Sequence, residues 1–197
     1  MSHIHTQPGQ YDLTVSAYIV RRDGLPTAGP VDSARPVLDD APTLLLHRHK
    51  TLGVWMQPGG HVELDETPWQ AIAHELREET GYDLDQLQVL QPVLRPPAPP
   101  GDVQHPQPVC LRSFPFGVGT NHFHTDLTFA FLTDAAPHHE VGQGESHQFA
   151  WVTRQQLDDL PAEQTYEDIR QLGLYIFDQL LAGWVPMPAT NFLTTWK

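Results

Sequence analysis

The chain has 197 residues, of which 40% are hydrophobic, and its formal net charge is −13. This length and apolar share predict one folded domain over residues 1–197 and exclude a globally disordered chain. The negative charge excludes a surface that coats nucleic acid, so no nucleic-acid partner is expected.

Cys110 is the single cysteine, which rules out an internal disulfide and fits a reducing compartment. The N-terminus lacks the basic-then-apolar order of a signal peptide, and no apolar run approaches membrane-spanning length. We therefore expect a cytoplasmic protein without a membrane partner.

The first third of the chain reads as strands around one long loop. Residues 13–22 are rich in β-branched and aromatic side chains and predict a strand. Residues 23–42 are rich in Gly, Pro and Asp and predict a loop. Strands are expected at 43–48 and 54–57, followed by a Gly-containing lead-in loop at 58–62.

A helix is strongly predicted after this loop. Thr67, Pro68 and Gln70 form a capping-box pattern with proline at the first helical position, and Gly81 supplies a left-handed stop. One apolar stripe at helical spacing should face the core; its members are Trp69, Ile72, Ala73 and Leu76.

The remaining elements are predicted from pattern in chain order. They are a strand at 87–94, a Pro-rich insertion at about 95–108, strands at 109–113 and 124–132, a polar loop at 135–146, a strand at 148–152, and helices at 153–159 and 163–181. The domain core then covers about 10–182. The tail 183–197 carries aromatic side chains that need cover, either on the domain or in a homodimer interface.

The predicted central helix carries three clustered carboxylates, Glu75, Glu78 and Glu79. Their i, i+3, i+4 spacing places them on one side of the helix, at the edge of its apolar stripe. Like charges this close repel, so the cluster favours a hard divalent cation with oxygen ligands.

This segment resembles the Nudix box, G-x5-E-x7-R-E-U-x-E-E-x-G-U, over residues 60–82. The matching positions are Gly60, Glu66, Glu75, Leu76, Glu78, Glu79, Gly81 and Tyr82. His74 stands where the family has Arg, and a histidine offers no bidentate fork to orient the glutamates.

The resemblance implies an α/β/α sandwich with a mixed sheet and hydrolysis of a phosphoanhydride in a nucleoside diphosphate derivative. It implies Mg²⁺, or alternatively Mn²⁺, held by the Gly60 carbonyl and by Glu75, Glu78 and Glu79. Glu66, His74 and Gly81 would support the site. Which nucleotide is cleaved, which phosphorus is attacked and how many metals bind stay open.

The general base has two candidates. Glu75 lies in the box and would act with Glu78 beside it. Glu145 precedes the last predicted strand, where a base from a later loop would lie, and Glu140 is the runner-up on the same loop. The alternative for Glu145 is a solvated loop residue.

Substrate contacts carry weaker signals. Arg48 and Lys50 flank an early strand and would meet phosphates, although surface solubility explains them as well. Phe116 is a candidate for stacking on a base, with loop packing as the alternative. Short-range histidine pairs such as His47/His49 and His122/His124 favour surface or structural roles over zinc, because no second Cys/His pair follows at zinc-site spacing.

Two rival functions stay open at this point. One is a non-catalytic, nucleotide-binding regulatory domain of the same family, which the His74 departure keeps in view. The other is an allylic diphosphate isomerase, which would need Cys110 near the cleft.

Overall fold

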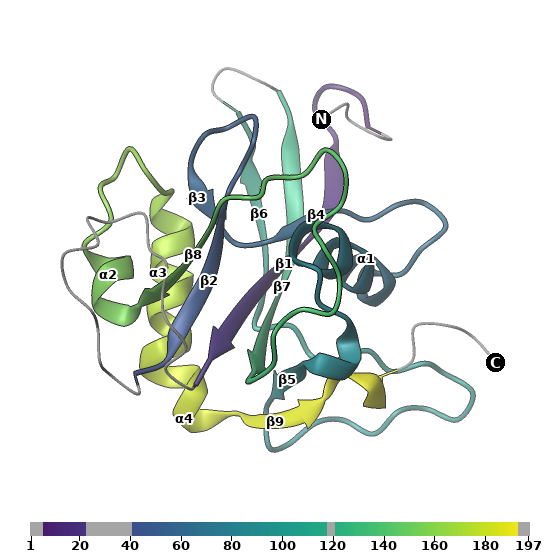
Figure 1. Cartoon of the computed structure of the whole chain (residues 1–197). Helices are drawn as coiled ribbons and strands as arrows, with labels where there is room; N and C mark the ends of the chain where they lie inside the picture. Colours follow the sequence, from purple (N-terminus) through teal and green to yellow (C-terminus); the bar gives the residue numbers. More distant parts are fainter. Residues whose placement is uncertain (1–5, 23–40, 118–120, 193–197) are drawn as a thin grey trace.

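The computed structural model describes residues 6–22, 41–117 and 121–192, and these form a mixed β-sheet flanked by helices (Figure 1). The strands are β1 (Tyr11–Arg21), β2 (Thr43–Arg48), β3 (Trp55–Met56), β4 (Gly59–His61), β5 (Gln88–Gln91), β6 (Cys110–Pro115), β7 (Phe123–Thr133), β8 (Phe149–Thr153) and β9 (Val185–Pro188). The helices are α1 (Pro68–Thr80), α2 (Arg154–Asp158), α3 (Glu167–Tyr175) and α4 (Leu181–Gly183), with single turns η1 (Leu84–Gln86), η2 (Ile176–Leu180) and η3 (Ala189–Asn191).

The sheet is built around one long parallel pair. The strand order is β3-β2-β1-β7-β5-β9, and β4, β6 and β8 pair with β1, β7 and β2, respectively. Strands β1 and β7 are parallel along their whole length, whereas the other pairings are antiparallel. The predicted α/β fold with a mixed sheet is confirmed.

Alternating residues of β1 divide the core into two layers. Val15 and Ile19 face the layer under α1, whereas Tyr18 and Val20 face the layer that includes Ile169 of α3. A buried strand with apolar residues on both faces needs cover on both sides, and helices supply that cover here.

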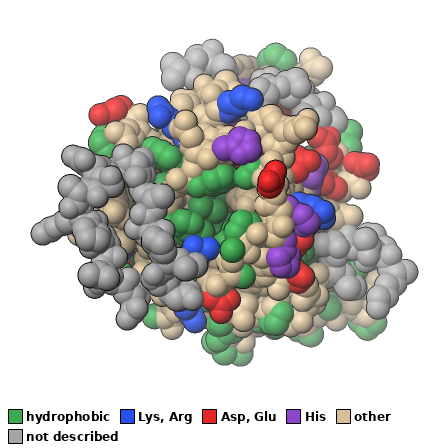
Figure 2. Space-filling model, viewed as in Figure 1, with side chains coloured by type: hydrophobic (Ala, Val, Ile, Leu, Met, Phe, Trp, Pro, Cys, Tyr) green, Lys and Arg blue, Asp and Glu red, His purple; other side chains and the backbone are tan. Residues whose placement is uncertain are grey.

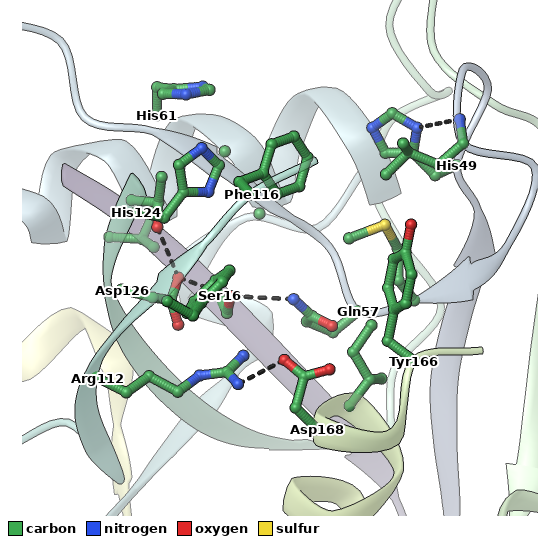
Figure 3. Close-up of a pocket in the computed structure, with 18 of the residues that line it drawn as sticks. Ser16, His49, Gln57, His61, Arg112, Phe116, His124, Asp126, Tyr166 and Asp168 are labelled. Carbon is green, nitrogen blue, oxygen red and sulfur yellow. Dashed lines mark hydrogen bonds and ion pairs between the residues drawn. The ribbon is translucent and has the colours of Figure 1, made fainter. Parts of the chain in front are cut away.

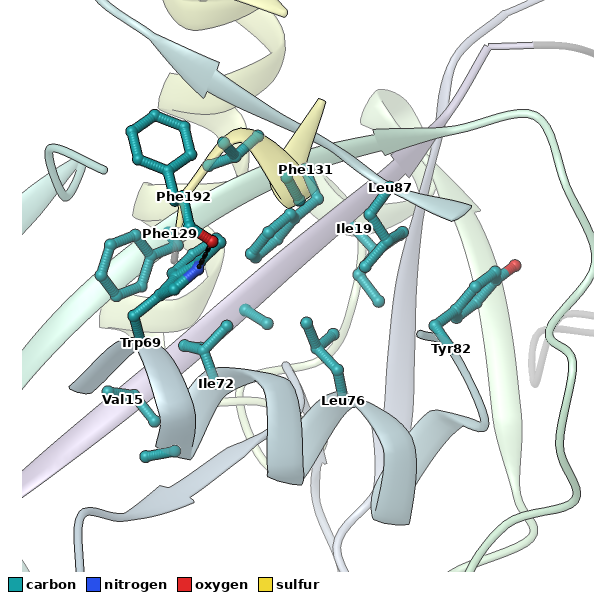
Figure 4. Packing of buried hydrophobic residues seen from close by; sticks show 14 of the residues in the cluster. Val15, Ile19, Trp69, Ile72, Leu76, Tyr82, Leu87, Phe129, Phe131 and Phe192 are labelled. Atoms are coloured by element: carbon teal, nitrogen blue, oxygen red, sulfur yellow. Dashed lines mark hydrogen bonds between the residues drawn. The ribbon is translucent and has the colours of Figure 1, made fainter. Parts of the chain in front are cut away.

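The layer under α1 is centred on Trp69, whose side chain is fully buried (Figure 4). Its ring centroid lies 5.5 Å from that of Phe129, 6.0 Å from Phe131 and 5.9 Å from Phe192. The indole Nε1–H donates to the Phe192 carbonyl at 3.3 Å, so this tryptophan ties α1 to the C-terminal segment.

Of the two kinds of cover expected for the aromatic C-terminal tail, the domain itself supplies the cover for Phe192. Residues of β9 pair with β5, and Phe192 is only 7% exposed, so the domain itself covers this aromatic side chain. Trp184 packs against the core layer that includes Tyr18 of β1 and Ile169 of α3. Trp196 lies outside the described residues.

Three predicted boundaries were wrong for identifiable reasons. The expected lead-in loop contains the strand β4, because its backbone pairs with β1. Strand β5 ends before Pro92, which has no N–H for the ladder. The long helix expected at 163–181 begins only at Glu167, after a turn in which Gln164 N donates to the Pro161 carbonyl, and contains the π-helical turn η2.

The Pro-rich insertion has no helix or strand, as predicted. The side chain of Gln91 anchors its far end, accepting from Gln107 N at 2.8 Å and donating to Gln107 O at 3.1 Å. Most of the predicted loop at 23–42 falls in residues 23–40, outside the described part of the chain. In that described part, no helix combines the length and apolar character needed to cross a bilayer.

Candidate active site

Helix α1 begins and ends at the predicted positions. Thr67 Oγ1 accepts from Gln70 N at 3.3 Å, and Gln70 Oε1 accepts from Thr67 N at 2.8 Å, which completes the capping box. Gly81 ends the helix in the left-handed region at φ = 76°. Both ends are therefore held, and the glutamates project from a rigid element.

Two of these glutamates pack against the backbone of β4. Glu79 is 6% exposed, and its Oε2 accepts from Gly59 N at 2.8 Å. The Glu75 carboxylate lies so close to Gly60 that a Cβ at this glycine would overlap it. Glu78, by contrast, has a half-exposed side chain.

Burial makes these carboxylates costly to ionise. It raises the pKa of Glu75 to about 7, aided by the negative charges of Glu78 and Glu145 and opposed by His74. Burial and the charge of Glu75 raise the pKa of Glu79 to about 9, although the hydrogen bond from Gly59 favours its charged form. Within the described residues, no Lys or Arg forms an ion pair with Glu75, Glu78 or Glu79.

The donor set suits a hard divalent cation. Crowded carboxylate oxygens beside an accessible backbone are the ligands that Mg²⁺ and Mn²⁺ take in proteins. A cation between them would supply the positive charge that the surrounding side chains lack. The close approach at Gly60 also explains why a glycine is needed there.

The loop before β8 brings a fourth carboxylate towards this cluster. Gly142 N donates to the Glu78 carbonyl at 2.7 Å and His139 N to the Gly81 carbonyl at 3.0 Å, so the loop follows the end of α1. Glu145 lies at the end of this loop, and its charge acts on both Glu75 and Glu79. Glu140 is exposed.

His74 and Glu66 contact each other at the start of the site. His74 Nε2 lies 3.1 Å from Glu78 Oε1, and its Nδ1 lies 3.9 Å from Glu66 Oε2. Burial alone lowers the pKa of His74, but the hydrogen bond and charge of Glu78 outweigh it and raise that pKa overall. Glu66 also accepts from Glu63 N at 2.9 Å, which closes the loop before α1.

His47 is a neighbour of the site that sequence reasoning did not place there. Its Nε2 lies 3.8 Å from Glu79 Oε2, and the ring is 3% exposed. Burial, with a smaller contribution from His49, lowers the pKa of His47 to about 4. The ring is therefore neutral near pH 7 and supplies no positive charge beside Glu79. No local sequence signal indicated the contact.

A cavity of about 590 Å³ adjoins the other side of β4 (Figure 3). Gly59 and Gly60 belong to its wall, together with aromatic and apolar side chains that include Phe116, Tyr166 and Met56. Polar groups at its base come from the sheet, where Asp126 accepts from Ser16 Oγ at 2.9 Å. This size and lining suit a small organic ligand.

The two predicted phosphate-binding cations bond elsewhere. Arg48 Nε donates to the Gly53 carbonyl at 3.2 Å, within its own turn. Lys50 Nζ donates to the Gly144 carbonyl at 2.8 Å and so holds the loop that carries Glu145. Of the three predicted substrate contacts, Phe116 is the one that lines the cavity.

A second cavity, of about 550 Å³, is lined by the loop before β8 together with Arg21, Tyr82 and Trp151. Figure 2 shows histidine and acidic side chains gathered beside an apolar hollow on this face of the molecule.

Comparison with protein families matches residues 31–172 to the NUDIX domain. A "MutT-like protein" of Streptomyces ambofaciens is 34% identical over 84 residues, which are 42% of this chain and 43% of that protein. An "8-oxo-dGTP diphosphatase" of Proteus vulgaris is 49% identical over 41 residues, 21% of this chain and 37% of that protein. The chain thus spans less than half the length of these curated relatives.

Solved structures share the fold at low sequence identity. A NUDIX-family hydrolase from Clostridium perfringens aligns with a TM-score of 0.62 and 22% identity, over 87% of this chain and 99% of that one. The Caenorhabditis elegans Ap4A hydrolase, as a binary complex, aligns with a TM-score of 0.57 and 18% identity, over 87% and 98% of the two chains. The NUDIX domain of Shewanella oneidensis NrtR, complexed with ADP ribose, aligns with a TM-score of 0.54 and 15% identity, over 83% of this chain and 84% of that one.

Proposed function

The chain belongs to the Nudix family, and we propose that it hydrolyses a phosphoanhydride bond in a nucleoside diphosphate linked to a further group. Glu75, Glu78, Glu79 and the Gly60 carbonyl would hold Mg²⁺, or Mn²⁺ in its place. One observation carries this proposal: Glu75 and Glu79 are packed against the Gly59–Gly60 backbone with no Lys or Arg paired to them among the described residues.

When bound, the ion would supply Lewis-acid chemistry and neutralise charge that develops on the phosphoryl oxygens. The protein's own groups position the reactants. Gly59 N–H orients Glu79, while His74 contacts both Glu66 and Glu78, so each supports a carboxylate. Glu145 takes the proton of the attacking water, and Glu75 is the alternative base.

The cavity beside β4 is the proposed place of the nucleoside, since its wall includes Gly59 and Gly60, against which the carboxylates pack. Phe116, which stacks on His124, and Tyr166 line this cavity and are the proposed contacts of the base. Names of related proteins, an 8-oxo-dGTP diphosphatase and an Ap4A hydrolase, support nucleotides as the substrate class.

Two other functions are weaker candidates. A regulatory, ligand-binding domain would retain the cavity, but it has no need for buried carboxylates that repel each other. An allylic diphosphate isomerase would need an acid–base cysteine at the cleft, and Cys110 is not among the described residues that line the cavity.

The first test is phosphate release from a panel of nucleoside triphosphates, sugar nucleotides, ADP-ribose and dinucleoside polyphosphates, with and without Mg²⁺. We expect metal-dependent turnover of one class, reduced at least ~100-fold by Glu79→Gln. Glu163→Gln, at an exposed carboxylate outside α1 and outside the loop before β8, is the matched control and should retain activity. Absence of turnover for the whole panel, with Mg²⁺ bound, would favour the regulatory function instead.

The second test separates Glu145 from Glu75. Because a general base contributes about 10²–10⁴-fold to rate, Glu145→Gln should lower kcat by about that factor. The Mg²⁺ concentration that gives half-maximal activity should stay unchanged, since this residue acts on the water. Glu75→Gln should raise that concentration as well. A Glu145→Gln enzyme with wild-type kcat would assign the base to Glu75.

A further inference from the structure

Four side chains near the N-terminal ends of β1 and β7 bring their possible metal-ligating atoms together. This cluster does not include the glutamates of α1. Its members are Asp12, His61, His122 and His124, and one nitrogen or oxygen of each lies within 4.8 Å of those of the others. We propose that these four residues bind a Zn²⁺ ion in a closed site that ties the ends of these strands together.

The sheet register explains how residues so distant in sequence meet. Asp12 pairs directly with His124 in the parallel β1–β7 ladder, and His61 of β4 pairs with Thr14, two residues along β1 from Asp12. His122 lies just before β7 begins, two residues from His124, and both side chains are buried. Four separate positions thereby converge on one point.

Two of the three distances between ligand atoms match those of a tetrahedral zinc site, and the third is shorter. Ligand atoms at about 2.0–2.2 Å from a tetrahedral ion lie about 3.3–3.6 Å apart. Asp12 Oδ2 lies 3.4 Å from His122 Nε2 and 3.6 Å from His61 Nε2. His122 Nε2 and His124 Nε2 lie 2.9 Å apart, so a small rotation of either ring completes the arrangement.

The rings are held in place and largely shielded from water. Asp12, His122 and His124 are 5–7% exposed. Phe116 stacks on His124 with ring centroids 4.3 Å apart and planes 11° apart, and His61 meets His124 edge-on at 5.1 Å. His61 and His124 lie next to Phe116 at one end of the cavity (Figure 3). Ligands fixed by packing lose little freedom when an ion binds.

The ligand chemistry selects the ion. Three imidazoles and one carboxylate suit Zn²⁺, whereas Mg²⁺ prefers oxygen ligands and retains its water. All four positions are filled by protein, which is the pattern of structural rather than catalytic zinc. The site therefore differs from the glutamate cluster in both ion preference and role.

The test is Zn²⁺ titration by calorimetry on the full chain after chelator treatment, with millimolar Mg²⁺ present to occupy oxygen-ligand sites. We expect one equivalent of Zn²⁺ to bind and the melting temperature to rise. His122→Ala and His124→Ala should each weaken Zn²⁺ binding at least ~10-fold. Co²⁺ in place of Zn²⁺ should give the visible absorption of a tetrahedral site.

Three control variants should retain Zn²⁺ binding. Glu79→Gln alters the carboxylate cluster of α1, and His138→Ala removes the exposed group formed with Asp83 and Asp85. The double variant His3→Ala/His5→Ala removes the N-terminal histidines present in the sequence. Loss of Zn²⁺ binding in any of these three would overturn the proposal.

Two further results would also overturn it. One is the absence of Zn²⁺ binding by the wild-type chain in Mg²⁺; the other is binding that survives both His122→Ala and His124→Ala. Asp12→Asn keeps the size of the side chain, so it should preserve the circular-dichroism spectrum while weakening Zn²⁺ binding. Should the alanine variants unfold, unchanged Zn²⁺ affinity in a folded Asp12→Asn variant would leave only a hydrogen-bonded histidine cluster.

Discussion

At the scale of single residues, His49 shows how hydrogen bonding and burial set a protonation state. Its Nδ1 accepts from Thr51 N at 3.2 Å and from Leu52 N at 3.1 Å, which requires the neutral ring. Burial lowers the pKa of His49 below its usual value. The unfolded chain therefore binds the proton more readily than the folded protein does.

Because the pKa is depressed in the folded state, this stabilisation is complete above about pH 6.5 and is lost as the pH falls towards the folded value. The contribution of His49 to the free energy of unfolding should thus decrease as the pH falls from 7 to 5, opposite in sign to the contributions of Glu75 and Glu79, whose pKa values are raised. His49→Asn supplies an amide oxygen that accepts the same two bonds without titrating. Urea denaturation across this range should show the free energy of unfolding of the wild type falling relative to that of the variant as the pH is lowered; a difference that does not change with pH would count against the assignment.

The same scale accounts for the glutamates. Their spacing on α1 was readable from the sequence, but the inequality among them was not. Glu79 is buried against Gly59 and Glu78 is half exposed, since the edge of a helix turns from core to solvent within one turn. His47 beside Glu79 comes from another strand, and no local pattern connects the two.

At the scale of elements, the C-terminal end of α1 sets the position of the loop before β8. Gly81 has φ = 76°, and an added Cβ would overlap the carbonyl of His139. Gly53 has a similar φ of 69°, but nothing lies within 4 Å of an added Cβ. Substitution of Gly53 therefore tests backbone strain alone, whereas substitution of Gly81 tests backbone strain together with the loss of close packing.

We expect Gly53→Ala to cost about 1 kcal/mol in free energy of unfolding, because of its left-handed backbone alone. Gly81→Ala should cost clearly more, about 2–4 kcal/mol, since it also displaces the loop at His139. Equilibrium urea denaturation of both variants measures the difference. Gly81→Ala should additionally lower phosphate release, because the same loop carries Glu145; equal costs for the two variants would refute the packing argument.

Elements with a strong local pattern were predicted well. The capping box of α1 and the strands β1, β2 and β7 agree with the sequence to within a few residues. In the apolar stripe, Trp69, Ile72 and Leu76 are buried as predicted, whereas Ala71 is buried in place of Ala73. The short strands β4 and β9 were missed. A strand of three or four residues has almost no periodicity of its own and exists through pairing with a neighbour.

At the scale of the whole molecule, the C-terminal segment closes the layer under α1. Phe192 packs against Trp69, and the guanidinium of Arg95 lies 5.3 Å from its ring centroid. Phe192→Ala should therefore cost about 3 kcal/mol in free energy of unfolding, because it leaves a cavity in the core. Leu64→Ala, at a side chain 81% exposed, is the control and should stay within about 0.5 kcal/mol of wild type.

Chemical denaturation of both variants tests this prediction. The slope of the free energy of unfolding against denaturant concentration should stay unchanged. A loss below about 1 kcal/mol for Phe192→Ala would mean that the tail contributes little to the core, contrary to the burial of its ring.

The amino-acid sequence by itself determined the fold class, the central helix with its caps, the cluster of glutamates on one helical side and the resemblance to the Nudix box. The helix and the glutamate cluster follow from periodicity and spacing, which are local properties of the chain, and the fold class was what the resemblance implies. Tertiary structure alone decided that Glu145 comes within electrostatic reach of Glu79, and that Asp12 and His61 meet His122 and His124. Such meetings depend on the register of β1 with β7 and β4 and on the path of a loop, and pairings between distant segments leave no local trace in the sequence.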